Sequence, residues 1–373
     1  MLFVGILLNV GCLGIADETI MLNGTNPSSI PDDEFADESP NIDNPNIVIP
    51  NINPNFEYEG TEIIARIDMG GILKPNSTDE YIYLRGTGDP EQNVWLDLDD
   101  KPKGFVVYNA SDGQFGSKLQ NDFVFLIDNS GSMDDEADAI AKDIVDWASK
   151  LSQEIDIRFA IVGYDGLITG AINFTDYEHI AAYLNRPGIT GTDRTVGFTG
   201  EDAEVLKSKT GPYNGKSAVE CGMAALHYAH DNFAFRKGAN RIYVNFTDEP
   251  NSVTNNDPRF SVEYLNNPEN WSPEYGTIHT VFSNVSKIHE DERSVLMSTY
   301  TGGTIMEASS DFKDVSLDNL PVTGAMQHAY IFKFGHLVDV LDDKVHNVRI
   351  TIYDDNGNVR AVKSFGVRFN PLK

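Results

Sequence analysis

Basic residues are scarce in this chain. The 373 residues include 28 lysines and arginines against 57 aspartates and glutamates, so the formal net charge is −29 at pH 7. Proteins that bind nucleic acids need basic patches facing the phosphates, and this shortage argues against nucleic acid as a partner. The excess of carboxylates suits a soluble protein that binds hard cations.

Signs of catalysis are also missing. The sequence contains no internal repeat, no glycine-rich nucleotide-binding loop and no hydrolase motif. Cys221 has His227 nearby in the sequence, but nothing else places a base beside a nucleophile, so we expect Cys221 to be a small packed residue. His227 and His230 lack a third ligand at metal-binding spacing. We therefore predict no enzymatic activity and no catalytic residues.

Long apolar runs and cysteines are equally rare. The apolar stretch Leu2–Gly11 is too short to span a bilayer and is followed by Cys12. Residues 1–12 resemble the signal of a bacterial lipoprotein cut before Cys12, which implies a lipid anchor and export to the outer membrane or cell surface. A signal without lipidation is the alternative. If Cys12 is lipidated, Cys221 is the one remaining thiol, so we expect no intrachain disulfide.

Composition divides the rest of the chain into segments. Hydrophobic residues make up 40% and aromatic residues 10%, so the chain can bury substantial cores, and its length suggests about two domains. Residues 13–55 are rich in Asn, Asp, Glu and Ser, and their prolines break regular elements. We expect a disordered linker over 13–55.

Short strand-like runs lie on both sides of the central part of the chain. Residues 56–118 contain Glu62–Ile67 and Gly104–Tyr108, and residues 323–373 contain Val348–Tyr353. Neither flank is long enough for a comfortable β-sandwich, but together they supply about 110 residues, the usual size of one. We therefore predict one sandwich built from 56–118 plus 323–373, with another domain inserted between them.

The central part contains the most informative motif. The apolar run Phe123–Ile127 is typical of a buried strand, and it leads into Asp128-Asn129-Ser130-Gly131-Ser132, which carries oxygen-bearing side chains at alternate positions. One carboxylate and two hydroxyls on such a loop can converge on a hard cation such as Mg²⁺. The same residues could instead be ordinary caps of the helix that follows.

The context favours the cation. After Met133, apolar residues at helical spacing predict a helix to about Leu151, with one stripe formed by Ile140, Ile144, Trp147, Ala148 and Leu151. A second apolar run, 242–246, ends in Thr247-Asp248. Ligands of open α/β sheets gather at the carboxyl ends of strands, so both acidic loops should share one rim.

The strand leading into Asp128-x-Ser130-x-Ser132, together with Thr247-Asp248, resembles the von Willebrand factor A domain and its metal-ion-dependent adhesion site. The resemblance covers residues 119–322. It implies an α/β, Rossmann-like domain, with a mostly parallel sheet between helices and a metal ion on the upper edge of the sheet. Asp128, Ser130 and Ser132 would supply the first loop, and Asp248 would act mainly through a bound water. Integrin β subunits have a similar insertion in a sandwich.

The middle loop, Ser217–Leu226, departs from the commonest pattern of that family, which offers a threonine. It resembles the integrin β version, in which a glutamate shortly before the helix binds the ion; the match falls on Glu220, with Ser217 as the alternative. A glutamate brings more negative charge than a hydroxyl, so it should hold the metal more tightly. A solvated first-turn glutamate favoured by the helix dipole remains the competing interpretation.

A second ion site is a further hypothesis. Asp134, Asp135, Glu136 and Asp138 crowd the first turn of the predicted helix. The integrin resemblance places Asp135 and Glu136 at an adjacent Ca²⁺ site. Acidic residues are also stabilised at a helix N-terminus without any metal, by about 0.3–1 kcal/mol each.

The sequence thus predicts an exported surface protein that captures an acidic side chain of a protein partner through Mg²⁺, Mn²⁺ or Ca²⁺, held by Asp128, Ser130, Ser132, Glu220 and Asp248. The alternative is a structural subunit of a surface assembly such as a pilus tip, in which the ion locks loops together. The acidity of the chain does not forbid an acidic ligand, because charges beyond about 8 Å are largely screened at physiological salt.

Overall fold

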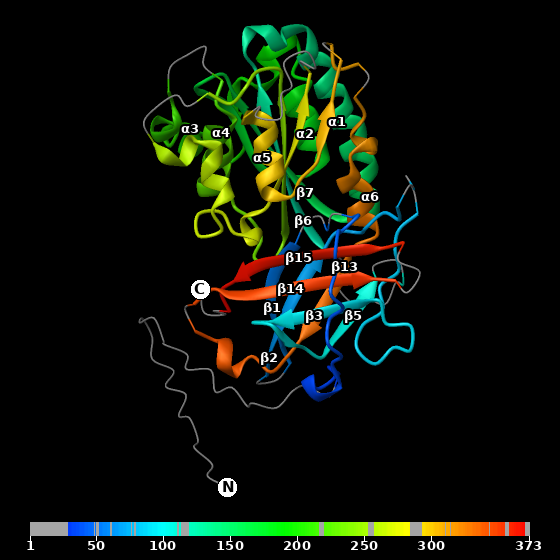
Figure 1. The fold of residues 1–373 in the computed structure, drawn as a ribbon. Helices are drawn as coiled ribbons and strands as arrows, with labels where there is room; N and C mark the ends of the chain where they lie inside the picture. The colour runs from blue at the N-terminus through cyan, green and yellow to red at the C-terminus, as the bar shows by residue number, and fades with distance from the viewer. Residues whose placement is uncertain are drawn as a thin grey trace.

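The computed structural model describes residues 29–47, 49, 52–59, 62–75, 77, 80–109, 112, 119–215, 220–252, 257–283, 293–309, 311–313, 315–342, 344–354 and 358–369. They form an α/β body from the middle of the chain and a β body from its two flanks, one above the other in Figure 1. No helix in this part of the chain combines the length and apolar character that crossing a bilayer requires.

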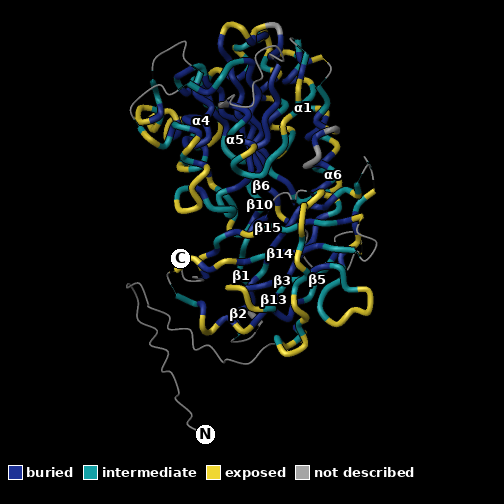
Figure 2. Tube along the Cα trace, in the orientation of Figure 1, coloured by how far each residue is buried: buried dark blue, intermediate teal, exposed yellow. Residues whose placement is uncertain are grey.

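The α/β body is built on a seven-stranded sheet. Its strand order is β12-β11-β10-β6-β7-β8-β9, and every neighbouring pair is parallel except β7 and β8. The central strand β6 contains the run Phe123–Ile127, which is buried on both faces, as expected for a strand covered by helices on either side (Figure 2). The strands are β6 (Gln120–Asp128), β7 (Asp156–Tyr164), β8 (Ile168–Thr175), β9 (Gly197–Thr199), β10 (Asn240–Thr247), β11 (Thr277–Phe282) and β12 (Ile305–Glu307).

Helices cover both faces of this sheet. One face packs against α1 (Asp134–Glu154), α2 (Tyr177–Leu184) and α6 (Pro321–Gln327), and the other against α3 (Ala203–Ser208), α4 (Gly222–Asn232) and α5 (Arg293–Thr301). The stripe expected on α1 is buried against the sheet, with the Trp147 ring 4.8 Å from the ring of Phe123. Short 3₁₀ helices join these elements, among them η3 (Gly131–Met133), η4 (Gly191–Thr195), η5 (Gly211–Tyr213), η6 (Pro258–Phe260), η7 (Val262–Asn266), η8 (Pro273–Tyr275) and η10 (Leu317–Asn319).

The β body is a sandwich of two antiparallel four-stranded sheets. One sheet has the order β1-β2-β13-β5 and the other β15-β14-β3-β4, and the apolar core lies between them. The strands are β1 (Ile52–Glu59), β2 (Glu62–Met69), β3 (Val94–Leu98), β4 (Lys101–Pro102), β5 (Phe105–Asn109), β13 (Tyr330–Phe334), β14 (His346–Tyr353) and β15 (Arg360–Val367); η1 (Asp33–Phe35) and η11 (Val338–Val340) are 3₁₀ helices.

Both flanks are needed to complete this sandwich. From the second flank, β13 lies between β2 and β5, and β14 pairs with β3. This confirms the predicted fold class, an α/β domain with a mostly parallel sheet between helices, inserted in a β-sandwich built from both flanks. The inserted domain was expected to end at residue 322, but α6 continues beyond it to Gln327. Thr323 on this helix accepts a 3.0 Å hydrogen bond from Trp147 Nε1 on α1, so the helix still packs against the α/β body.

The described part of the expected linker lies against the sandwich. Ile30 and Ile49 are buried, and Asp33 accepts a 2.6 Å hydrogen bond from Lys103 Nζ. The expectation of disorder therefore does not hold for residues 29–47, and β1 already begins at Ile52. Prolines prevent regular elements there, but an irregular chain can still bury apolar side chains and pair its polar groups. Residues 13–28, like the signal with Cys12, lie outside the described residues.

Candidate functional site

The two acidic loops meet at the carboxyl end of the central sheet. Strands β6 and β10 are parallel neighbours, with Phe246 opposite Ile127, so the last residues of the two strands, Thr247 and Asp128, lie side by side. The Thr247 hydroxyl donates a 2.7 Å hydrogen bond to Asp128 Oδ2. The shared rim thus follows from strand pairing between residues far apart in the sequence.

Further contacts connect Asp128 to three more residues with oxygen donors. Asp128 Oδ1 accepts a hydrogen bond of 2.9 Å from the backbone N–H of Ser130. Ser130 Oγ lies 3.1 Å from Ser132 Oγ, and Ser132 Oγ donates to Asp248 Oδ1, also at 3.1 Å. The structure therefore brings together four of the residues that the sequence suggested, Asp128, Ser130, Ser132 and Asp248.

This donor set fits a hard cation. In an octahedral site with metal–oxygen distances of about 2.1 Å, neighbouring ligand oxygens lie about 3 Å apart. The two 3.1 Å separations along Ser130, Ser132 and Asp248 have this spacing. All donors are carboxylate or hydroxyl oxygens, which Mg²⁺, Mn²⁺ and Ca²⁺ prefer over nitrogen or sulfur.

The burial of the Asp128 carboxylate also favours a bound cation. Its side chain is fully buried, and this burial is the main cause that raises its pKa to about 7. The nearby charge of Asp248 also acts to raise that pKa. Hydrogen bonds from Ser130 and Thr247 lower that pKa but do not offset the burial. Among the described residues, no cationic side chain forms an ion pair with Asp128. A cation at the rim would stabilise the buried carboxylate.

Buried polar groups support the rim from below. Tyr164, at the end of β7, donates a 2.7 Å hydrogen bond to Asn245 Oδ1 on β10, and burial raises the pKa of Tyr164 well above its usual value. Asn129 Nδ2 donates to Thr169 Oγ1 at 2.6 Å and to Thr195 Oγ1 at 3.0 Å.

The roles of these supporting residues were not expected from the sequence. Thr247 was recognised there as part of the Thr247-Asp248 pair, but its bond to Asp128 follows only from the alignment of β10 with β6. Asn129, Tyr164 and Asn245 carry no local signal, because each contacts a residue at least 40 positions away.

The structure places Glu220 near the rim through its backbone. The carbonyl of Glu220 accepts a 2.8 Å hydrogen bond from the N–H of Ser252, which ties the loop before α4 to the loop after β10. Among the residues that the structure describes, the half-buried Glu220 side chain forms no hydrogen bond or ion pair with Asp128, and no group of three or more His, Cys, Asp or Glu side chains could hold a metal. Its role as a ligand stays a prediction, and Ser217 lies outside the described residues.

Two aspartates in the acidic first turns of α1 bind the neighbouring 3₁₀ helix η4. Asp134 Oδ1 accepts a 3.2 Å hydrogen bond from the N–H of Thr192, and Asp138 Oδ1 accepts one of 3.0 Å from the N–H of Gly191. Arg194 also pairs with Asp138, so these two aspartates hold η4 against α1. Of the residues proposed for a second Ca²⁺ site, Glu136 is buried and the Asp135 side chain lies outside the described residues; that site stays a prediction.

The other chemically reactive side chains considered in the sequence are packed largely in the interior. Cys221 is buried and forms no disulfide within the described part of the chain. His227 and His230 are packed among aromatic rings, with centroids 5.7 Å and 5.0 Å from the ring of Trp271. Burial lowers the pKa of both histidines to about 4, so they are neutral at physiological pH.

Comparison with known proteins gives distant likenesses. No family model and no curated protein matches the chain. Solved structures that resemble it include an aerotolerance-related membrane protein from Bacteroides fragilis, 13% identical, covering 55% of this chain and 98% of that one with a TM-score of 0.32. The PilB minor pilin from Streptococcus sanguinis is 12% identical, with coverages of 74% and 75% and a TM-score of 0.33.

A third similar structure is the vWF domain of the type V pili tip protein Mfa5 from Porphyromonas gingivalis, 13% identical over 52% of this chain and 91% of that one, with a TM-score of 0.30. Because these TM-scores lie far below 0.5, the functional case rests on the geometry of this chain alone.

Proposed function

We propose that the rim formed by Asp128, Ser130, Ser132 and Asp248 binds a divalent cation and that the protein uses it at the bacterial surface to capture an acidic side chain of a protein partner. The observation that carries the proposal is the buried carboxylate of Asp128, with its raised pKa, bonded to the Ser130 N–H beside the hydroxyl and carboxylate oxygens of Ser130, Ser132 and Asp248. A bound cation would supply an open coordination position for a carboxylate oxygen from outside.

The residues of the rim would have different roles in holding the cation and in admitting the partner. Asp128 supplies charge from the buried side, held by the Thr247 hydroxyl and the Ser130 N–H. Ser132 is exposed, whereas Ser130 and Asp248 are largely buried, so the rim opens to solvent on the Ser132 side. An acidic partner would approach from that side.

Surface display would come from a lipid on Cys12, as the sequence suggests. The contacts of residues 29–47 with the sandwich mean that the folded body begins about 20 residues after that cysteine, and not after a linker reaching residue 55. The partner would therefore meet the rim closer to the membrane than a linker over 13–55 implies.

The first test is a calorimetric titration with Mg²⁺, Mn²⁺ and Ca²⁺. Asp128→Asn keeps the shape of the side chain and should abolish binding, while Asp146→Asn, which removes an exposed carboxylate on the same helix α1, should bind like wild type. Circular dichroism checks the fold of each variant. Unchanged metal binding by Asp128→Asn would refute the cation site.

The second test is capture of partners from bacterial outer surfaces, with Mg²⁺ or with chelator, by wild type and Asp128→Asn. Capture should need both the metal and Asp128. If the protein binds metal but docks or assembles equally well in chelator, the structural alternative replaces ligand capture.

A further inference from the structure

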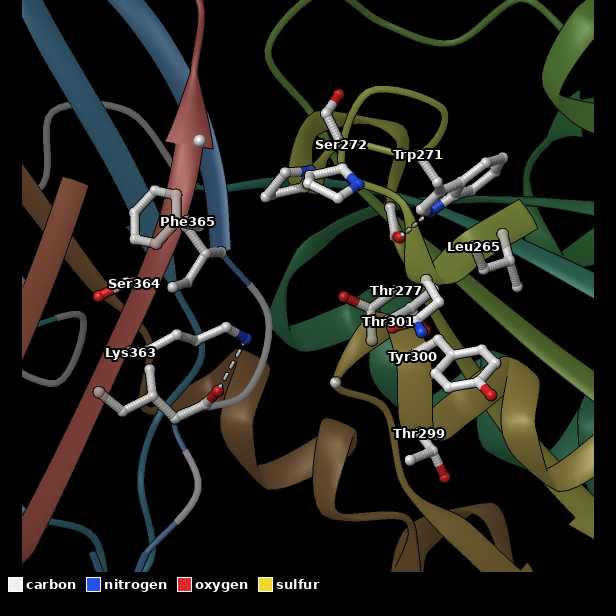
Figure 3. Close-up of a pocket in the computed structure, with 18 of the residues that line it drawn as sticks. Leu265, Trp271, Ser272, Thr277, Thr299, Tyr300, Thr301, Lys363, Ser364 and Phe365 are labelled. Atoms are coloured by element: carbon white, nitrogen blue, oxygen red, sulfur yellow. Dashed lines mark hydrogen bonds between the residues drawn. The ribbon is translucent and has the colours of Figure 1, made fainter. Parts of the chain in front are cut away.

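A cleft lies between the α/β body and the sandwich, far from the candidate metal rim. Its volume is about 640 Å³, within the roughly 300–1,000 Å³ typical of small-molecule sites. The segment before β1, the loops around η7 and η8, the end of α5 and the strand β15 all line it (Figure 3). Side chains on its walls are mainly apolar, including Ile47, Ile49, Leu265, Pro268 and Pro273.

One cationic side chain reaches into this apolar cleft. Lys363 extends from β15 toward the α/β body in Figure 3, and its Nζ donates a 3.0 Å hydrogen bond to the carbonyl oxygen of Ile49. An ammonium group has three N–H donors, so this bond leaves two uncommitted by it. Lys363 forms no ion pair with any acidic residue that the structure describes, although the chain has 57 aspartates and glutamates.

The environment of the amine is poorly suited to an isolated charge. Burial lowers the pKa of Lys363 to about 8. A Cβ on Gly302, just beyond the end of α5, would lie 3.0 Å from Lys363 Nζ, so the amine faces the C-terminal end of that helix, where partial negative charge favours a cation. The amine is thus held in place but lacks a full counter-charge.

We propose that this cleft binds a small amphipathic carboxylate, whose acid group pairs with Lys363 and whose apolar part packs against the isoleucines and prolines of the walls. Charge complementarity favours a carboxylate over a neutral molecule, because an anion supplies the missing counter-charge. The apolar walls favour a hydrocarbon or aromatic body over a sugar or nucleotide. The site is independent of the proposed metal rim.

Octanoate is a suitable probe, with octan-1-ol as its neutral counterpart of equal chain length. Calorimetric titration of the wild-type protein should show saturable octanoate binding and at least about tenfold weaker binding of octan-1-ol. Lys363→Met should weaken octanoate binding by a similar factor. The matched control Lys333→Met, which removes a lysine paired with Glu57 in the sandwich, should have no effect, and neither should Asp128→Asn.

A measurement on the wild type alone tests the proposal without depending on whether a variant folds. Raising the pH from 7 to 9.5 takes the solution through the pKa of Lys363 while octanoate stays ionised, so octanoate affinity should fall by about tenfold or more and octan-1-ol affinity should not change. No octanoate binding at millimolar concentration, equal binding of acid and alcohol, or an octanoate affinity independent of pH and of Lys363 would each overturn the proposal.

Discussion

The hydroxyl of Thr247 donates a 2.7 Å hydrogen bond to Oδ2 of Asp128, across 119 positions of sequence. This bond joins the ends of β10 and β6 at the rim and fixes one oxygen of a fully buried carboxylate. It therefore links the pairing of the central strands to the geometry of the candidate metal site.

We expect Thr247→Val to damage both stability and metal binding. Valine has nearly the same shape but leaves Asp128 Oδ2 without this donor, which should cost about 1–3 kcal/mol of unfolding free energy. Metal affinity should fall because the carboxylate is no longer held in place. Chemical denaturation and calorimetry measure the two effects, and Thr247→Ser, which keeps the hydroxyl, should stay close to wild type. A valine variant with wild-type metal affinity would show that this bond does not position Asp128.

The contribution of Asp128 to the stability of the metal-free protein should fall as the pH rises from about 4 to about 7. The pKa of Asp128 is about 7 in the fold against an ordinary 3.8, so in this window the folded state binds more protons than the unfolded one, and stability falls with pH. The effect amounts to at most about 4 kcal/mol. In chelator, the stability of the wild type relative to Asp128→Asn should fall as the pH rises through this window, and Mg²⁺ should restore stability at pH 8 in the wild type. An identical pH profile for the variant would contradict this prediction.

His227 and His230 should destabilise the protein in acid. Their pKa values of about 4 in the fold lie below the ordinary 6.5, so their contribution is complete above pH 6.5 and is lost as the pH falls toward 4. Each histidine accounts for roughly 3 kcal/mol. His227→Phe should flatten the acid limb of the denaturation profile, whereas His179→Gln, which removes only an exposed pair with Asp176, should change it much less. The sign is opposite to that of Asp128, so comparing each variant with wild type separates the two.

Gly104→Ala should loosen residues 29–47 from the sandwich. A Cβ at Gly104 would lie 2.1 Å from the carbonyl oxygen of Pro31, so backbone must move. The contact of Asp33 with Lys103 should weaken with it. Limited proteolysis should then cut within 29–47 faster than in wild type. Gly211→Ala serves as the control, because nothing lies within 4 Å of a Cβ there. Equal cleavage of the Gly104 variant and wild type would show that the segment is not held at this point.

Prediction from sequence succeeded where the signal is local. The buried run Phe123–Ile127 and the apolar stripe of α1 were recognisable from side-chain spacing, because that spacing depends on neighbours within a few residues. The sandwich shared by two flanks could be inferred because neither flank alone has enough residues for one. The packed segment 29–47 was missed, since its contacts with Lys103 and Arg360 lie far away in the sequence.

In the candidate site, too, some features could be predicted from the sequence and others could not. The donor types of Asp128, Ser130, Ser132 and Asp248 follow from their identities and from the strands that precede them. The use of Asp134 and Asp138 to hold η4 was not visible, because an acidic first turn looks the same whether it faces a metal, solvent or a neighbouring loop.

The sequence by itself determined which residues can form strands and helices and which oxygen atoms are available to a cation. Only the tertiary structure decided that β10 lies beside β6, that Thr247 holds Asp128, and that Lys363 enters a cleft between the two bodies. The physical reason is that periodicity is a property of adjacent residues, whereas the convergence of donors depends on the packing of segments that the chain separates by a hundred residues or more.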